Sequence, residues 1–294
     1  MHADDVPTTA DQVARMVAEQ HPRWSHLPVT PVAEFGTDHC LFRIGDDLVA
    51  RMPRVAWAAD QAHSDATWLP VLAPYLPVTV PAPLALGEPD EHYPFAWSVA
   101  PWLPGATPTD ENADPHTLAA DLGGFVRTLH AVDASAGPRK TGTARGTPIR
   151  GWDPYVREAI DEAGDRIDRA RVTEAWEDCL AAPDWAGDPV WIHGDLMPGN
   201  LLVRDRRLSA VIDWGALGVG DPAPDLAPAW YTVPSAREEF RQAVGYDDDT
   251  WRRARGWAMG PALTGIPYYW DTVPAFAQRG LRTIAAVLAD LDGQ

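Results

Sequence analysis

The stretch "VWIHGDLMPGNLLVRDRRLSAVIDWG", Val190 to Gly215, decides how the rest of the chain is interpreted. It places the polar residues His193, Asp195, Asn200 and Asp213 among the apolar runs VWI, NLLV and LSAVI. Such runs are typical of buried strands, and buried carboxylates are costly unless cations compensate them. We therefore expect a loop that leads into a β-hairpin with its turn at 204–207, and a bound Mg²⁺, which prefers oxygen ligands of this kind.

The spacing of these polar residues is specific. His193-x-Asp195-x4-Asn200 is followed by Asp213 thirteen positions later, and this resembles the catalytic loop and metal-binding aspartate of the protein-kinase-like phosphotransferases. "HGDLMPGNLLV…AVIDWG", followed by "GDPAPDLA", is more closely similar to the aminoglycoside phosphotransferase family. Turn-forming aspartates and asparagines are the structural alternative, which explains single residues but not their combined spacing.

The resemblance implies a role for each of these residues. Asp195 would accept or orient the proton of the substrate hydroxyl, and Asn200 and Asp213 would hold Mg²⁺ against the nucleotide phosphates. His193 and Asp225 would give structural support. His193 would hold the loop by hydrogen bonds, and Asp225 would brace the loop or cap the next helix.

Composition and charge argue against several classes of protein. The chain has 294 residues, of which 46% are hydrophobic and 22% charged, as in globular proteins with one large domain or two small lobes. A net charge of -18 argues against a nucleic-acid partner. The acidic surface either keeps the protein in solution or steers a cationic small molecule toward it. No apolar run approaches the roughly 20 residues of a membrane helix, so no membrane partner is expected.

The N-terminus and the cysteines indicate the compartment. "MHADDVPTTADQ" lacks the apolar region of a signal peptide. Cys40 and Cys179 are too few and too far apart for a disulfide framework. We therefore expect a cytoplasmic protein, and a monomer because no heptad or exposed strand-edge signature stands out.

Hydrophobic periodicity divides the chain into a β-rich first part and an α-rich second part. Thr9 with Gln12 resembles a capping box that starts a short helix. A hairpin around "GDD", an Ala-rich helix and two further strands follow. Breakers cluster in Leu103–Pro115, which indicates a link. After it we expect helices at about 116–133, 154–181, 235–244, 249–263 and 274–290.

Together with the resemblance, this organisation implies an α+β, bilobal, protein-kinase-like fold. Residues 1–102 would form a small, mostly antiparallel β lobe that binds the nucleotide. Residues 103–294 would form a larger, mainly helical lobe that carries catalysis and binds the acceptor.

The family normally holds the nucleotide phosphates with a strand lysine paired to a helix glutamate. The matching positions here are Arg51 in "DDLVARMPR" and Asp65 in "HSDATWLP", and both depart from that pattern. A shorter carboxylate could compensate for the longer guanidinium. Arg54 is the rival cation, and an ordinary strand arginine is the alternative explanation of Arg51.

The remaining nucleotide contacts are expected from the backbone. The phosphate-covering loop would be "EFGTDHC", which lacks GxGxxG and offers Gly36 and Thr37. Ala100 and Trp102 in "WSVAPWL" would offer backbone hydrogen bonds to the base, where Pro101 has no N–H. The donor would be ATP or GTP.

The acceptor pocket would be built from residues after 150. Carboxylates would bind ammonium groups, and aromatic faces would take sugar rings or cations; the alternative is that the aromatic residues belong to the core. The candidates are Trp152, Asp153, Asp221, Trp230, Tyr231, Tyr268, Tyr269, Trp270 and Asp271.

These observations predict a nucleoside-triphosphate-dependent O-phosphotransferase that acts on a small-molecule alcohol, an aminoglycoside or another antibiotic, and so would confer antibiotic resistance. One alternative is a kinase for a sugar or amino-alcohol metabolite. Others are a metal-dependent hydrolase built on His193, Asp195 and Asp213, and a pseudokinase that binds nucleotide without turnover, which Arg51 and Asp65 leave open.

Overall fold

The computed structural model describes residues 5–32 and 38–293, which divide into two compact units. The first unit contains Met1–Gly105 and Ala210–Gly215, and the second contains Ala106–Ser209 and Ala216–Gln294. The chain therefore leaves the second unit for one short segment that belongs to the first. Asp213 lies in this returning segment.

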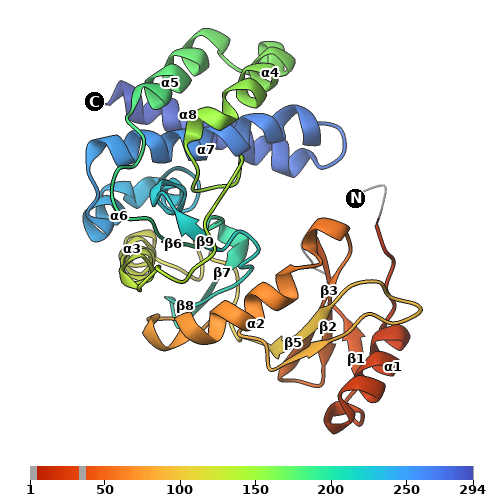
Figure 1. Ribbon diagram of the computed structural model, residues 1–294. Coiled ribbons are helices and arrows are strands. Elements are labelled where there is room, and N and C mark those ends of the chain that lie inside the picture. Colours follow the sequence, from red (N-terminus) through yellow and green to blue (C-terminus); the bar gives the residue numbers. More distant parts are fainter. Residues whose placement is uncertain (1–4, 33–37, 294) are drawn as a thin grey trace. The chain divides into compact units, whose positions relative to one another are not determined.

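The first unit is built on an antiparallel sheet with the strand order β1-β2-β3-β5-β4 (Figure 1). The expected hairpin is formed by β2 and β3, where Gly45 takes the left-handed conformation with φ 58°. The bounds of the strands are β1 Val29–Pro31, β2 His39–Ile44, β3 Leu48–Pro53, β4 Ala85–Gly87 and β5 Trp97–Pro101.

Helix α1 (Ala10–Gln20) covers one face of this sheet. As expected, Thr9 caps it, since the Thr9 side chain accepts a hydrogen bond from the backbone of Gln12. Val13 and Met16 pack into a core with alternate residues of the strands, among them Met52. Because neighbouring side chains of a strand point to opposite faces, Arg51 lies on the other face of the sheet. Helix α2 (Gln61–Leu72) also belongs to this unit.

The second unit is mainly helical (Figure 1). Helix α7 packs extensively against α8 and also contacts α4 and α5, while α3 packs against α6. The bounds of the helices are α3 Pro115–Ala131, α4 Asp153–Ala163, α5 Arg169–Ala181, α6 Arg237–Val244, α7 Asp248–Tyr269 and α8 Pro274–Asp292. Short 3-10 helices along the chain are η1 Pro22–Trp24, η2 Ala56–Ala58, η3 Ala73–Tyr75, η4 Ile149–Trp152, η5 Gly164–Arg166, η6 Pro198–Asn200, η7 Ala223–Trp230 and η8 Pro234–Ala236.

The single helix predicted at 154–181 is wrong, because the segment forms α4 and α5. Gly164 ends α4 with a positive φ of 56°, a conformation that does not continue a helix. The Asp168 side chain then caps α5 by accepting from the backbone N–H of Arg171. Both halves are amphipathic and polar, so their periodicity alone did not reveal the break.

Two small strand pairs hold the segment from Val190 to Gly220. Strand β6 (Val190–Ile192) pairs antiparallel with β9 (Gly218–Gly220). Strands β7 (Leu201–Arg204) and β8 (Arg207–Val211) form the expected hairpin. Its turn residues Asp205 and Arg206 have φ angles of 52° and 63°, as a two-residue turn of the primed type requires. The loop 193–200 is thus anchored by a strand at each end.

Within residues 5–32 and 38–293, no helix combines the length and apolarity that crossing a bilayer requires.

Candidate active site

The carboxylate of Asp195 is held by donors from two parts of the second unit. Arg145 Nη1 forms an ion pair with Asp195 Oδ1 and donates to the carbonyl oxygen of Gly194 at 2.8 Å. Asn200 Nδ2 donates to the backbone oxygen of Asp195 at 2.8 Å and approaches Oδ2 at 3.3 Å. Both carboxylate oxygens are therefore oriented, while the side chain keeps 27% of its surface exposed.

The buried carboxylate of Asp225 stabilises the backbone of this loop. Asp225 accepts hydrogen bonds from the backbone N–H groups of His193 and Gly194, at 2.9 and 2.6 Å. Its Oδ2 also lies 3.2 Å from Nε2 of His130, whose Nδ1 is 2.9 Å from the hydroxyl of Tyr246. His193 is fully buried, and its Nδ1 accepts from the Asp195 N–H at 3.1 Å. Asp225 and His193 thus hold the loop backbone rather than reach into solvent.

Arg145 was missed by the sequence analysis. It lies in the Gly/Pro/Arg-rich segment 138–153, far from the HGD motif along the chain, and no spacing rule connects the two. Burial opposes the charged form of Arg145, but Asp195 and the other groups around it, Tyr231 and Asp225, together outweigh this effect and raise the pKa of the guanidinium. The only available signal was a basic residue in a strongly acidic chain.

The first unit gathers a second set of charged groups around Arg51. Arg51 Nη2 lies 3.5 Å from Asp213 Oδ1. With its amide oriented to satisfy its neighbours, the carbonyl oxygen of Gln61 accepts from Arg51 Nη2 and from the Gly215 N–H, both at 3.0 Å. Asp213 itself takes the left-handed conformation with φ 61°, and its side chain is 46% exposed. Arg51 and Asp213 are thus brought together by tertiary structure.

The expected ion pair between Arg51 and Asp65 is not formed, since no charged atoms of the two side chains lie within 4.0 Å. Asp65 is buried, and its Oδ1 has no hydrogen-bond partner. Burial raises the pKa of Asp65 to about 6, although Arg51 acts in the opposite direction. His39, on the same sheet face as Arg51, was not foreseen; burial and Arg51 lower its pKa to about 3. The rival cation Arg54 is occupied by Asp5, which its Nε contacts at 2.7 Å.

The residues predicted to contact the nucleotide base have backbone partners of their own. Ala100 pairs with Val49 across β5 and β3. The Trp102 N–H donates to the Asp47 carbonyl at 2.7 Å, so this N–H is already engaged within the first unit. Gly36 and Thr37 lie outside the described residues.

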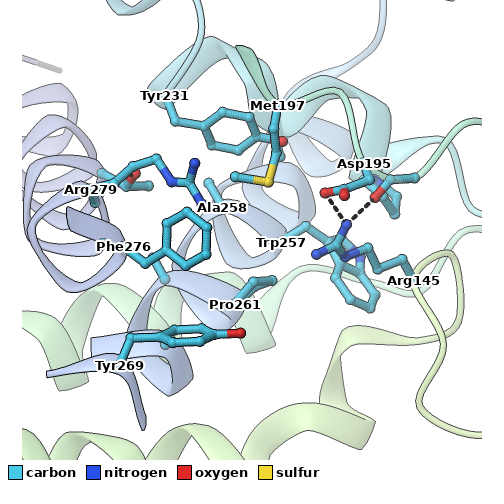
Figure 2. A pocket seen from close by; sticks show the side chains of 17 residues that line it. Arg145, Asp195, Met197, Tyr231, Trp257, Ala258, Pro261, Tyr269, Phe276 and Arg279 are labelled. Atoms are coloured by element: carbon cyan, nitrogen blue, oxygen red, sulfur yellow. Dashed lines mark hydrogen bonds and ion pairs between the residues drawn. The ribbon is translucent and has the colours of Figure 1, made fainter. Parts of the chain in front are cut away.

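A cavity of about 190 Å³ opens beside Asp195 in the second unit (Figure 2). Of the acceptor candidates, Tyr231 and Tyr269 line it. The cavity also takes residues that the sequence did not single out. These are chiefly Arg145, Met197, Trp257, Phe276 and Arg279.

The other acceptor candidates do not line this cavity. Asp153 accepts from Trp176 and pairs with Arg157, and Trp230 is buried with its Nε1 donating to Asp290. The guanidinium of Arg166 stacks over Trp270, and Asp221 forms a buried pair with Arg253. Tyr268 and Asp271 are exposed, and Trp152 packs edge-on against Trp257.

Comparison with known proteins decides the family. The model of the phosphotransferase enzyme family matches residues 30–257, well over half of the chain. The chain belongs to the phosphotransferase enzyme family. The resemblance seen in the HGD and IDW motifs is thereby confirmed.

One curated relative within this phosphotransferase family is an aminoglycoside 3'-phosphotransferase from Escherichia coli, 29% identical over 137 residues. The match covers 45% of this chain and 51% of that protein, so the chain spans about half the length of this relative.

Solved structures of phosphotransferases match over nearly the whole chain and confirm the expected kinase-like fold. The GDP complex of aminoglycoside 2'-phosphotransferase-IIIa has a TM-score of 0.74 at 19% identity, covering 97% of this chain and 100% of that one. Macrolide 2'-phosphotransferase from Brachybacterium faecium has a TM-score of 0.63 at 27% identity, covering 95% and 98%.

The two residues predicted to hold magnesium, Asp213 in the first unit and Asn200 in the second, each carry an oxygen donor of the kind that Mg²⁺ prefers. The Asp213 carboxylate is half-exposed. The amide nitrogen of Asn200 donates to Asp195, and its side-chain carbonyl oxygen could bind a cation. In the described part of the chain, no three His, Cys, Asp or Glu side chains cluster to hold a metal by themselves. Mg²⁺ needs no such cluster, because it usually keeps waters and binds one or two carboxylates together with substrate phosphates.

Proposed function

We propose that this protein transfers the γ-phosphoryl group of a nucleoside triphosphate to a hydroxyl group of a small molecule. The hydroxyl oxygen attacks the γ-phosphorus, the bond from that phosphorus to its bridging oxygen breaks, and the nucleoside diphosphate leaves. Asp195 orients the hydroxyl and takes its proton. The observation that carries this proposal is the Asp195 carboxylate, held by Arg145 and Asn200 at the wall of a cavity.

The charged groups around the phosphates take complementary roles in this proposal. Arg51 would bind nucleotide phosphate oxygens as the family's strand lysine does, and Asp213 and Asn200 would each supply an oxygen ligand to Mg²⁺. When bound, the ion neutralises charge on the β- and γ-phosphate oxygens. The donor is ATP or GTP. Because the reaction consumes a nucleoside triphosphate, we also propose the cytoplasm as its compartment.

The acceptor proposed on the grounds of similarity is an antibiotic alcohol. An aminoglycoside is supported by the curated relative, which is 29% identical over 137 residues. A macrolide is supported by the Brachybacterium faecium structure, which is 27% identical over 95% of this chain, against 19% for the structure of aminoglycoside 2'-phosphotransferase-IIIa. Both classes carry sugar hydroxyls, and both suit the reaction above.

Mass spectrometry of an acceptor panel tests this function. The protein is incubated with Mg²⁺ and either ATP or GTP, and with aminoglycosides, macrolides, sugars and amino alcohols. We expect a phosphate-mass gain on one class. It should fall about 10²- to 10⁴-fold in Asp195→Asn, the range that a catalytic base contributes. Asp188→Asn, an exposed position a few residues before the motif, is the matched control and should keep full activity.

Two outcomes would contradict the proposal. Equal activity of Asp195→Asn and Asp188→Asn would remove Asp195 from the reaction. Bound nucleotide without turnover on any member of the panel would favour the pseudokinase alternative.

A further inference from the structure

The cavity beside Asp195 has apolar walls. Its large side chains are Met197, Tyr231, Trp257, Tyr269 and Phe276, and the rest of its lining is mostly small apolar residues of η7, α7 and α8. Figure 2 shows the aromatic rings and the Met197 thioether around one central space. A ligand in this space would be enclosed chiefly by apolar surface.

Three charged side chains line the cavity, and their balance is positive. Arg145 and Asp195 form an ion pair and largely neutralise each other. Arg279 is the third, and it approaches from α8 across the space from Asp195 (Figure 2). Among the residues that the structure describes, no second carboxylate lines the cavity.

Arg279 has an aromatic neighbour rather than a carboxylate partner. Its guanidinium carbon lies 4.6 Å from the ring centroid of Phe276. Across residues 5–32 and 38–293, no carboxylate forms an ion pair with it. The guanidinium is half-buried, and burial lowers its pKa even though the Asp195 charge works against this.

A half-buried guanidinium without a carboxylate is stabilised by an anionic ligand. Its planar donors match a carboxylate in a two-pronged arrangement. Binding of a polycationic ligand is disfavoured, because its ammonium groups would lose their hydration beside the positive Arg279 side chain. In the cavity lining, Asp195 is the carboxylate that could pair with them. The cavity lining thus differs in sign from the whole chain, whose net charge is -18.

We propose that the acceptor is a mainly apolar alcohol that carries a carboxylate, bound by Arg279 while its hydroxyl faces Asp195. This inference rests on the proposed phosphotransfer and replaces the acceptor class suggested by similarity with one suggested by the cavity lining. A cavity of about 190 Å³ is below the roughly 300–1,000 Å³ of drug-sized pockets. It would therefore enclose a compact acceptor, or one ring system of a larger one.

A matched set of small probes tests the inference. The probes are 3-hydroxy-2-phenylpropanoate, its methyl ester and the corresponding amine, 3-amino-2-phenylpropan-1-ol, with kanamycin and erythromycin for comparison. Binding is measured by calorimetry, and transfer is measured separately by mass spectrometry with Mg²⁺ and ATP or GTP. We expect the acid to bind more tightly than its ester and the amine to bind most weakly of the three.

Variants of Arg279 and of the nearby Arg282 test whether Arg279 is the side chain that binds the carboxylate. Arg279→Gln should weaken binding of the acid about ten- to a hundredfold, the usual worth of hydrogen bonds to a charged group, and remove its preference over the ester. Arg282→Gln alters an exposed arginine of the same helix outside the cavity lining and should leave binding within about twofold. Arg279→Glu should reverse the preference toward the amine. Thermal unfolding of each variant checks that the fold is intact.

The outcomes separate this inference from the proposed function. Equal binding of acid and ester, or equal effects of the two Gln variants, overturns the inference. Phosphorylation of kanamycin at an unchanged rate in Arg279→Gln would also overturn the inference. The same result would support the proposed phosphotransferase function. An Arg279-dependent preference for the acid without any phosphate transfer would keep the anion site and overturn the proposed function.

Discussion

At the scale of single residues, the candidate base is oriented by partners on both sides of it in the sequence. Arg145 precedes Asp195 by fifty positions and Asn200 follows it by five. The second contact is local and could be expected from the motif. The first depends on how the segment 138–153 folds back onto the loop, and no residue pattern encodes that return.

Replacing Arg145 tests its part in orienting Asp195. In Arg145→Gln the contacts to Asp195 and to the Gly194 carbonyl are lost or weakened, so we expect kcat to fall on the order of 10²-fold, the cost of a small misplacement of a catalytic group. Arg145→Lys should recover part of this loss. Arg150→Gln is the matched control, because Arg150 lies in the same segment but is exposed and pairs with Asp184.

Steady-state kinetics separates this role from a merely structural one. KM for the nucleotide should change little in Arg145→Gln, because Arg145 lies in the cavity lining and not in the first unit. A change in nucleotide KM with unaltered kcat would argue against the role.

Arg51 and Asp213 give the second residue-scale prediction. Arg51→Ala removes a cation that contacts Asp213, so nucleotide affinity should fall about tenfold or more, and Arg51→Lys should keep part of it. Asp213→Ala should weaken binding of the Mg²⁺-nucleotide more than binding of nucleotide with EDTA. Calorimetry with and without Mg²⁺ measures both. Arg23→Ala, on the exposed surface of the first unit, should match the unaltered protein.

Elements were easier to predict than the contacts between them. The capped first helix, the hairpins and most helices follow from local signals such as Thr9 and the turn at Asp205 and Arg206. The short spacing between Asp195 and Asn200 likewise predicted that both lie in one loop. The two cavity arginines could not be predicted, because Arg145 and Arg279 come to line the same cavity through the packing of segments that are distant in sequence. That Arg51 contacts Asp213 was not predicted either, because the position of Asp65 on its helix does not fix how far its side chain reaches.

The glycine of the HGD motif is predicted to be essential to the geometry of the catalytic loop. Gly194 has a φ of 79°, and an added Cβ would lie 3.0 Å from the Ala216 carbonyl oxygen. Gly194→Ala should therefore cost about 1–3 kcal/mol of unfolding free energy and lower kcat by displacing Asp195. Urea denaturation and initial rates measure the two effects.

Gly199 supplies the control within the same loop. It has no positive φ, and an added Cβ meets no atom within 4 Å. Gly199→Ala should change stability by less than about 1 kcal/mol. Similar losses in both variants would show that backbone conformation at Gly194 is not the cause.

At the scale of the whole molecule, charge is distributed unevenly. The chain carries a net charge of -18, yet the cavity beside Asp195 is lined by two arginines and one carboxylate. Long-range and local electrostatics therefore act in opposite directions on an anionic ligand. Long-range forces are screened beyond about 10 Å at 0.1 M salt, while short contacts are screened much less.

Salt should thus affect the probes differently. The association rate of 3-hydroxy-2-phenylpropanoate should rise with added KCl, by less than about tenfold, as repulsion by the whole chain is screened. The rate for kanamycin should fall, and the uncharged methyl ester should be insensitive. Stopped-flow measurements over a salt series give these rates. A decrease for the anionic probe would mean that local charge already dominates its approach.

The returning segment Ala210–Gly215 has a consequence for dividing the gene. It belongs to the first unit although the chain on both sides of it belongs to the second. Cutting after Gly105 would therefore put Arg51 and Asp213 on different polypeptides, and neither polypeptide alone could form their contact. Two such fragments, each fused to one of a pair of interacting proteins, would recover nucleotide binding only on reassembly. The path of the backbone thus makes this chain a natural starting point for a split reporter.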